Sequence, residues 1–314
     1  MKTKVILYIN QIFITAAILI SLLLMNPMQG STDVIFSQGP VDHALSRVSD
    51  WSNDNQKSDD FTLLQGPMTI TKISWWGSYG ANPDPSTDDF VFKFFEVDTE
   101  NPGYPQIWCF GNGTRYARSS SSNDFTKTAT TMVSNASGTH DGGVVYAYSA
   151  VLDRPIRLEA NKRYWLAITN ATPSATGIVK PNSKWGWLES GVGNQWYRMG
   201  HCPMCADDWS VSNTKNFAFS LETFPIVGLN NKSASDPIIS NASNKFLFTV
   251  WGKARITGTD KFEIDDGSGK LTSVESPGFT GFADNDYVKA TGLLSYSSGG
   301  SVLKADAADV VKIR

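Results

Sequence analysis

The chain has few of the residues on which disulfide-rich or metal-rich proteins depend. Its 314 residues include only three cysteines and three histidines. Three cysteines leave one over if the other two pair, so disulfides cannot be the framework of a fold of this size. The hydrophobic fraction of 41% provides enough material for a globular core, and the length leaves room for two domains.

Charge is also scarce, and no part of the chain beyond its first residues is basic. Charged residues make up 18% of the sequence, below the average of about 25%. Residues 31–242 carry sixteen basic and twenty-one acidic side chains, and residues 243–314 carry nine of each. Because binding to nucleic acid requires a basic surface that neutralises phosphates, we expect no nucleic-acid partner.

After residue 30 the sequence lacks the 3.6-residue apolar repeat of amphipathic helices. Aromatic and β-branched residues instead alternate with small or polar ones, most clearly in 70–77 and 158–169. Gly, Asn and Pro end each short run, as they do at the ends of half-buried strands. This pattern predicts an all-β protein, with a β-sandwich over residues 31–224.

The one long apolar run is in the first thirty residues. Lys2 and Lys4 precede an apolar stretch from Val5 to Met25, and a polar segment ends at Gly30. This order is typical of a secretory signal peptide, although an uncleaved run of about 20 residues could also anchor a chain in a bilayer. We therefore expect residues 1–30 to form a signal or anchor helix. The protein would be secreted, periplasmic or on the cell surface, and would touch the membrane only through this segment.

Residues 246–314 form a second, smaller strand pattern. The preceding segment, 225–245, is rich in Asn, Ser, Lys and Pro, which predicts a linker. Five strands are expected after it, and Gly252 in the first of them suits a sharply coiled, closed sheet. The runs 250–254, 262–269 and 286–292 resemble those of the bacterial oligonucleotide/oligosaccharide-binding (OB) fold. This resemblance implies a small five-stranded OB-type barrel.

The larger block is similar to a family of secreted bacterial β-sandwich modules of unassigned function. The similarity covers residues 34–223 and rests on 58–61, 73–77, the strand Phe90–Phe95 that leads to Asp98, and 161–166. It implies export and a jelly-roll-like sandwich, and it names no ligand.

Glu96, Asp98 and Glu100 alternate along one predicted strand. Carboxylates at alternate strand positions lie on one face, and a retaining glycosidase needs two of them about 5 Å apart. The spacing resembles the Glu-x-Asp-x-Glu strand of laminarinase-type jelly-roll glycosidases. The phenylalanines that precede them on the same face look like core residues, however. The alternative interpretation is therefore a core strand whose end emerges into solvent.

His201, Cys202 and Cys205 form a second candidate site. They could supply three ligands of a zinc site, with Cys109, Asp207 or a distant histidine as the fourth. In an exported protein, a disulfide between Cys202 and Cys205 is the simpler interpretation, and we favour it.

Paired acidic residues recur in four places along the chain. Loop carboxylates with neighbouring carbonyl groups can hold calcium, although we expect most of these residues to cap backbone N–H groups in turns. We therefore expect no cofactor, with calcium or zinc as the ions that these residues could hold. The four pairs are Asp59–Asp60, Asp88–Asp89, Asp207–Asp208 and Asp265–Asp266.

A cluster of aromatic residues forms the third candidate site. Exposed aromatic rings can hold the apolar faces of sugar rings, which would make this cluster a ligand-binding surface. Burial between two sheets is the commoner fate of tryptophan, and both interpretations remain open. The cluster consists of Trp185, Trp187, Trp196, Tyr197 and Trp209.

These patterns favour a secreted or cell-surface protein without catalytic activity, which binds or adheres. Its sandwich would bind an extracellular glycan or an envelope component, and its barrel would be an accessory interaction domain. Two alternatives remain. One is a jelly-roll glycoside hydrolase that uses Glu96, Asp98 and Glu100, and the other is a structural protein of the envelope or matrix.

Overall fold

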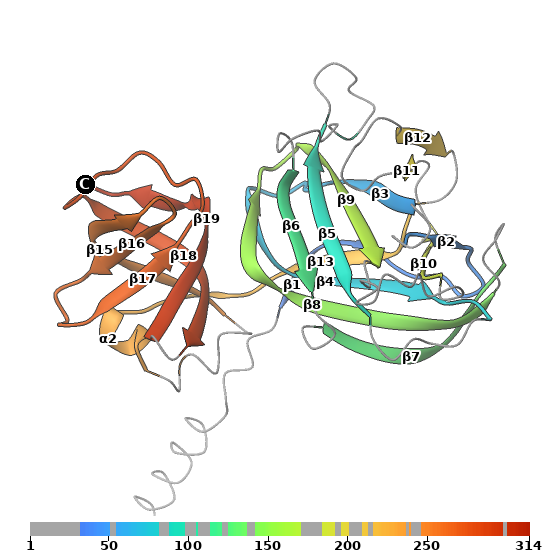
Figure 1. Cartoon of the computed structure of the whole chain (residues 1–314), viewed down its shortest axis with the longest axis horizontal. Coiled ribbons are helices and arrows are strands. Elements are labelled where there is room, and N and C mark those ends of the chain that lie inside the picture. The colour runs from blue at the N-terminus through green and yellow to red at the C-terminus, as the bar shows by residue number, and fades with distance from the viewer. Residues whose placement is uncertain are drawn as a thin grey trace, which may run out of the picture. The chain divides into compact units, whose positions relative to one another are not determined.

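The computed structural model describes residues 32–50, 55–81, 88–97, 105, 114–120, 125–136, 142–170, 184–191, 196–200, 209–212, 216–236, 239, 246–297 and 300–314 (Figure 1). Thr32–Arg314 form one compact unit. The described residues are almost entirely strand, which confirms the predicted all-β class. They build a jelly-roll-like sandwich and a closed five-stranded barrel of the OB type.

The first sheet of the sandwich has seven strands. Its central strand, β4 (Met68–Ser78), pairs with β13 and β10 along one edge and with the long strand β8 along the other. The outer strands are β1 and β2 beyond β13 and β10, and β7 beyond β8. The bounds are β1 (Asp33–Gln38), β2 (Ser46–Val48), β7 (Phe125–Ser134), β8 (Gly143–Leu158), β10 (Gly186–Leu188) and β13 (Phe219–Thr223).

The second sheet has six strands in the order β12-β11-β3-β9-β5-β6. All pairings within it are antiparallel, as they are in the first sheet. Figure 1 shows β6, β5 and β9 side by side. The bounds are β3 (Asn55–Thr62), β5 (Phe90–Glu96), β6 (Thr114–Ser120), β9 (Arg163–Asn170), β11 (Trp196–Gly200) and β12 (Trp209–Ser212), and only the backbone of β6, β11 and β12 is described.

Aromatic side chains from both sheets fill the space between them. Trp75 of β4 has no exposed surface, and its ring stacks on Tyr148 at 5.3 Å between centroids. The same ring meets the edge of Phe92 from the second sheet at 4.9 Å. Such pairs contribute about 0.5–1.5 kcal/mol each beyond the burial of their surface. The core therefore holds the two sheets together through ring contacts as well as aliphatic packing.

Alternation along β4 decides which side chains enter this core. Ile73 and Trp75 are buried in it, whereas Lys72, Ser74 and Trp76 lie on the opposite, outer face and are half-buried. Successive side chains of a strand point to opposite faces, so alternate residues of 72–76 lie on the inner and the outer face of the sheet.

The barrel closes because its first strand pairs with its fourth. The strands follow one another around the barrel in the order β15-β16-β17-β19-β18, and β18 returns to β15. A Cβ atom on Gly252 would lie 2.2 Å from the carbonyl oxygen of Asp265, so only glycine fits where β15 coils against β16. The bounds are β15 (Leu247–Gly258), β16 (Lys261–Asp265), β17 (Leu271–Glu275), β18 (Tyr287–Ser297) and β19 (Gly300–Lys312).

The segment expected to be a linker contributes to the packing of the barrel. Strand β14 (Ile226–Gly228) pairs in parallel with the start of β15. A single helical turn, α2 (Asn231–Ala234), follows, and the Asn230 side chain caps it. Asn231 is fully buried, and its side chain donates to the carbonyl of Ile264 at 2.6 Å. Residues 226–234 thus pack on the barrel, although their polar composition predicts a linker.

Several strand assignments differ from the sequence pattern. Residues 143–158 form one strand, β8, where two short strands, 144–151 and 155–159, are expected. Strands β2, β6, β7, β12 and β14 are not expected from the sequence. The predicted leader, residues 1–30, lies outside the described residues. Within the described residues, no helix has the length and apolar character needed to cross a membrane.

We expect Trp75→Ala to lower the free energy of unfolding by about 3–5 kcal/mol, because it removes a buried ring shared by both sheets. Leu64→Ala is the matched control. Leu64 is 81% exposed, and its truncation should change stability by less than about 0.5 kcal/mol. Urea unfolding followed by circular dichroism measures both. Equal effects of the two substitutions would show that Trp75 does not join the sheets.

Candidate functional site

Two of the five aromatic residues predicted to contact a ligand are core residues. Trp185 and Trp187 have no exposed surface. Trp185 meets the edge of Phe90 at 4.9 Å, and Trp187 stacks on Phe217 at 4.6 Å. The expectation of exposed ring faces is therefore wrong for these two residues, because they fill the space between the sheets.

Gly77 explains why Trp185 can be buried in this way. A Cβ atom on Gly77 would lie 2.5 Å from the indole ring of Trp185, so the ring packs directly on the backbone of β4. Trp196 and Tyr197 lie in β11 and Trp209 lies in β12, next to each other in the second sheet. Their side chains are outside the described part of the structure, so their predicted role stays a prediction.

The predicted glycosidase carboxylates begin at the end of a core strand. Five of the six residues that precede Glu96 in β5 are hydrophobic and all six are buried, as the alternative interpretation requires. The Glu96 carboxylate accepts a hydrogen bond from the Lys162 ammonium group at 3.1 Å. Asp98 and Glu100 lie outside the described residues, so their distance from Glu96 is not part of the structure.

The predicted zinc or disulfide site also lies outside the described residues. His201, Cys202 and Cys205 belong to this part of the chain, as does Cys109. In the ranges that the structure describes, no group of three or more His, Cys, Asp or Glu side chains lies close enough together to hold a metal ion.

The described acidic pairs bind protein groups. Asp265 and Asp266 accept hydrogen bonds from the backbone N–H groups of Gly267 and Ser268, as expected for turn residues. Asp59 is fully buried and accepts from the N–H of Phe217 at 2.6 Å. Burial raises the pKa of Asp59 well above its usual value, although this hydrogen bond opposes the shift.

Asp88 is buried at one end of the sandwich in an aromatic cluster. The ammonium group of Lys127 lies 2.8 Å from its carboxylate and 4.6 Å from the ring centre of Tyr146. The hydroxyl of Tyr79 and the amide of Asn170 also donate to this carboxylate. These three groups are all donors from within the chain, and Lys127 balances the charge of the Asp88 carboxylate.

A row of hydroxyl side chains crosses five strands of the first sheet. Directly paired residues of antiparallel strands lie on the same face, so their side chains stand next to one another. Here five consecutive partners all carry a hydroxyl group. In order across β1, β13, β4, β8 and β7, this hydroxyl row consists of Ser37, Ser220, Ser74, Ser149 and Thr126.

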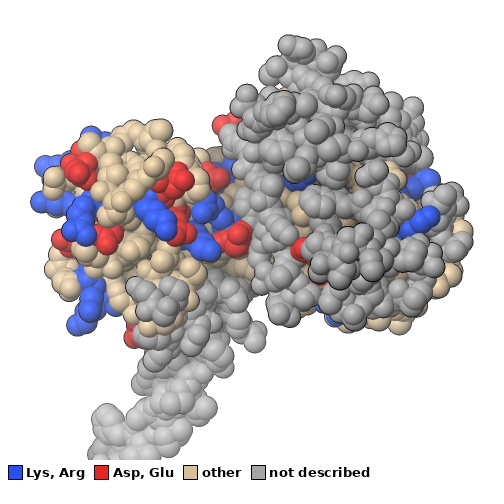
Figure 2. Space-filling view, in the orientation of Figure 1, with Lys and Arg blue, Asp and Glu red and all other residues tan. Residues whose placement is uncertain are grey.

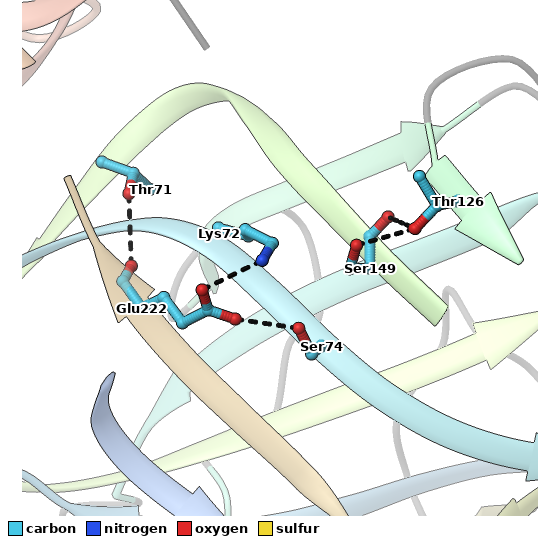
Figure 3. A network of polar contacts seen from close by, with 6 residues as sticks. All are labelled: Thr71, Lys72, Ser74, Thr126, Ser149 and Glu222. Atoms are coloured by element: carbon cyan, nitrogen blue, oxygen red, sulfur yellow. Dashed lines mark hydrogen bonds and ion pairs between the residues drawn. The ribbon is translucent and has the colours of Figure 1, made fainter. Parts of the chain in front are cut away.

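The hydroxyl row lies on the outer face of the sheet and is open to solvent over much of its length. Ser37 and Thr126 at its two ends are exposed, Ser74 and Ser149 are half-buried, and Ser220 is buried. The hydroxyl oxygens of Thr126 and Ser149 are 2.8 Å apart. Figure 3 shows the two side chains in contact. Each hydroxyl group can both donate and accept a hydrogen bond.

An ion pair borders the hydroxyl row on one side. The Glu222 carboxylate accepts from the Lys72 ammonium group at 3.0 Å and from the Ser74 hydroxyl at 2.9 Å (Figure 3). Burial raises the pKa of Glu222, but these donors and the hydroxyl of Thr32 outweigh it, so the pKa is lowered from its ordinary value. The carboxylate therefore stays ionised and orients Ser74.

A half-buried tryptophan borders the row on the other side. Trp76 is two residues beyond Ser74 on the same face of β4, and it pairs with Ala147. Its ring packs against Val145, Leu188 and Ala218. The outer face thus offers hydroxyl groups, one ion pair and part of an aromatic ring, all held by strand pairing.

Comparison with known protein families identifies one family whose matched region includes this sheet. A model for a domain of unknown function (DUF7901) matches residues 36–221, more than half of the chain. The chain belongs to this family. The DUF7901 match begins at Phe36 in β1 and ends at Leu221 in β13, and these two residues pair directly in the first sheet. The match therefore covers the sandwich, and the barrel lies beyond it. Among curated proteins, none matches the chain.

Glu222 lies one residue past the region that the DUF7901 model matches. The substitution Glu222→Gln should alter the acid dependence of stability. A carboxyl group whose pKa is lowered by folding contributes stability above its unfolded pKa, and this contribution is lost as the pH falls through the lowered folded value. The stability difference between wild type and variant should therefore shrink between pH 6 and pH 2.5, measured by urea unfolding. Glu159→Gln is the control, because the side chain of Glu159 is 63% exposed. A difference that does not change with pH would contradict the lowered pKa.

Asp59→Asn should have the opposite pH dependence. A carboxyl group whose pKa is raised by folding costs stability as the pH rises from the unfolded pKa, near 4, towards the folded value, because the unfolded chain releases the proton first. The stability of the variant relative to wild type should therefore increase from pH 4 to pH 8. Chemical unfolding at several pH values measures this trend. A flat or falling trend would show that folding does not raise the pKa of Asp59.

Proposed function

We propose that this protein acts at the cell exterior as a non-catalytic binding protein, and that the hydroxyl row of its sandwich binds a glycan. The observation that carries the proposal is the register of five strands, which aligns five hydroxyl side chains on one outer face. The apolar run behind Lys2 and Lys4 supports export.

The chemistry of the face suits a neutral, polyhydroxylated ligand. Sugar hydroxyls donate and accept, and so do Ser and Thr hydroxyls, so either partner can supply the hydrogen. The ion pair between Lys72 and Glu222 leaves no net charge that would select an anion. The half-buried ring of Trp76 adds an apolar surface beside the row.

The length of the row favours an extended ligand. Neighbouring strands lie about 4.8 Å apart, so five strands place the outermost hydroxyl groups about 19 Å apart. A single sugar ring would cover only part of this distance. We therefore expect an oligosaccharide or polysaccharide of the cell surface or envelope, lying across the strands.

The glycosidase alternative receives no comparable support. Glu96 is ion-paired with Lys162 at the end of a core strand, and its two predicted partners lie outside the described residues. The face with the hydroxyl row carries the Glu222 carboxylate, which is held by Lys72, Ser74 and Thr32. A carboxylate held in this way is suited to positioning a hydroxyl group rather than to proton transfer.

Binding to a glycan array tests the proposal. We expect wild-type protein to retain one class of glycan, and the triple variant Ser74→Ala, Ser149→Ala, Thr126→Val to bind it at least tenfold more weakly. Each lost hydrogen bond costs about 0.5–1.5 kcal/mol, and about 1.4 kcal/mol is a factor of ten in affinity.

The matched control removes hydroxyl groups elsewhere. Thr257→Val with Thr280→Val changes two exposed threonines of the barrel and should leave glycan affinity unchanged. Urea unfolding establishes that both variants are folded. If wild-type protein binds no glycan, or if the triple variant binds as tightly as wild type, the hydroxyl row is not a glycan site.

A further inference from the structure

The outer wall of the barrel carries a patch of exposed apolar side chains. Trp251 is 47% exposed and Tyr287 is 43% exposed, and the aliphatic residues Val311 and Ile313 are 46% and 57% exposed. Among the side chains that the structure describes, all exposed aromatic ones belong to the barrel. An exposed cluster of this kind marks an interaction surface more often than a scattered apolar residue does.

Strand register places these residues in two neighbouring rows. Trp251 of β15 pairs with Lys289 of β18, which pairs with Val311 of β19. In the next row Lys253 pairs with Tyr287, and the N–H of Ile313 donates to the carbonyl of Tyr287 at 2.7 Å. Trp251, Tyr287, Val311, Ile313, Lys253 and Lys289 together are called the interfacial patch.

The charged members of the interfacial patch are both lysines. The ammonium group of Lys253 lies 5.8 Å from the ring centre of Tyr287. Asp286, which precedes Tyr287 in the sequence, is ion-paired with Lys312 at 2.8 Å. Figure 2 shows basic and acidic side chains interspersed over the barrel surface in view. Both charged members of the interfacial patch are therefore basic, while Lys253 also pairs across the strands with the acidic Asp265.

We propose that the interfacial patch binds the surface of an anionic lipid bilayer. Tryptophan and tyrosine rings combine an apolar body with a polar atom, which suits the headgroup region of a membrane. Lysine side chains between them can keep their stems in the apolar region and place the ammonium groups among anionic headgroups.

Aliphatic side chains and shape distinguish this surface from a sugar site. Val311 and Ile313 offer nothing to the hydroxyl groups of a glycan, whereas they gain by entering the acyl boundary of a bilayer. Strands β15, β18 and β19 form part of the outer, convex wall of a closed barrel. Side chains that protrude from such a wall can contact a broad, flat surface such as a bilayer. The described groove of the barrel shares Lys253 with the interfacial patch, extends over β16 and has mixed charge, with Arg255, Glu263 and Asp265 among its lining residues.

Vesicle flotation of the compact unit Thr32–Arg314 tests the proposal. This unit lacks the apolar leader, so any affinity of the leader for membranes does not contribute to the result. We expect binding to vesicles of phosphatidylglycerol and phosphatidylcholine in equal parts, and weak binding to phosphatidylcholine alone. Lys289→Glu should weaken binding about 25-fold, because it changes two unit charges and each contributes about fivefold. Trp251→Ala should weaken binding about tenfold, because it removes buried apolar surface. Added salt should weaken vesicle binding of the wild-type protein, because it screens the lysine charges.

Two matched controls change similar residues outside the interfacial patch. Tyr296→Ala removes a ring that is 54% exposed, and Lys270→Glu reverses an exposed charge; neither should alter vesicle binding. Equal binding to both kinds of vesicle, no binding to either, or unchanged binding of Lys289→Glu and Trp251→Ala would overturn the proposal. Retention on an acidic polysaccharide without vesicle binding would overturn it as well.

Discussion

The aromatic layer between the two sheets is the constraint on which the rest of the sandwich depends. Trp75, Tyr148 and Phe92 join the sheets, while Trp185 rests on the bare backbone of Gly77. Once these rings occupy the inner face, the period of two along each strand sends the intervening residues outward. The hydroxyl row exists because Ser74 and Ser149 alternate with Trp75 and Tyr148. Core packing and surface chemistry are thus two results of one register.

Much of the fold could be predicted from the sequence, because local alternation and turn residues are sufficient to identify most strands. Strand β7 was harder, since it pairs with one neighbour only and most of its residues, many of them threonines, are not buried. Strand β8 contains Pro155, which from the sequence predicts an interruption. The structure shows one strand instead, with a register shift against β4 at this place. The packing of residues 226–234 on the barrel depends on partners that are distant in sequence.

The candidate sites were less predictable, because sequence distance hides which residues meet. Trp185 and Trp187 lie among Gly, Ser and Asn residues in the sequence, as exposed aromatic residues often do. The burial of Trp185 depends on Gly77, which is distant in sequence and leaves room for the ring. Ser37 and Ser220 are widely separated in the chain and become neighbours through the pairing of β1 with β13. Trp251, in contrast, could have been recognised as outward-facing, since it alternates with the core residue Val250 and the constrained Gly252.

Strand β14 and the α2 turn determine where the barrel begins. Val227 and Leu229 pack against its core, Ala234 is part of that core, and Asn231 accepts a hydrogen bond from Thr272 at 2.9 Å. A fragment that starts at Phe246 would lose these groups and would expose one edge of β15 and the amide partners of Asn231. A gene fragment for the isolated barrel should therefore start upstream of Ile226, although the composition there looks like that of a spacer.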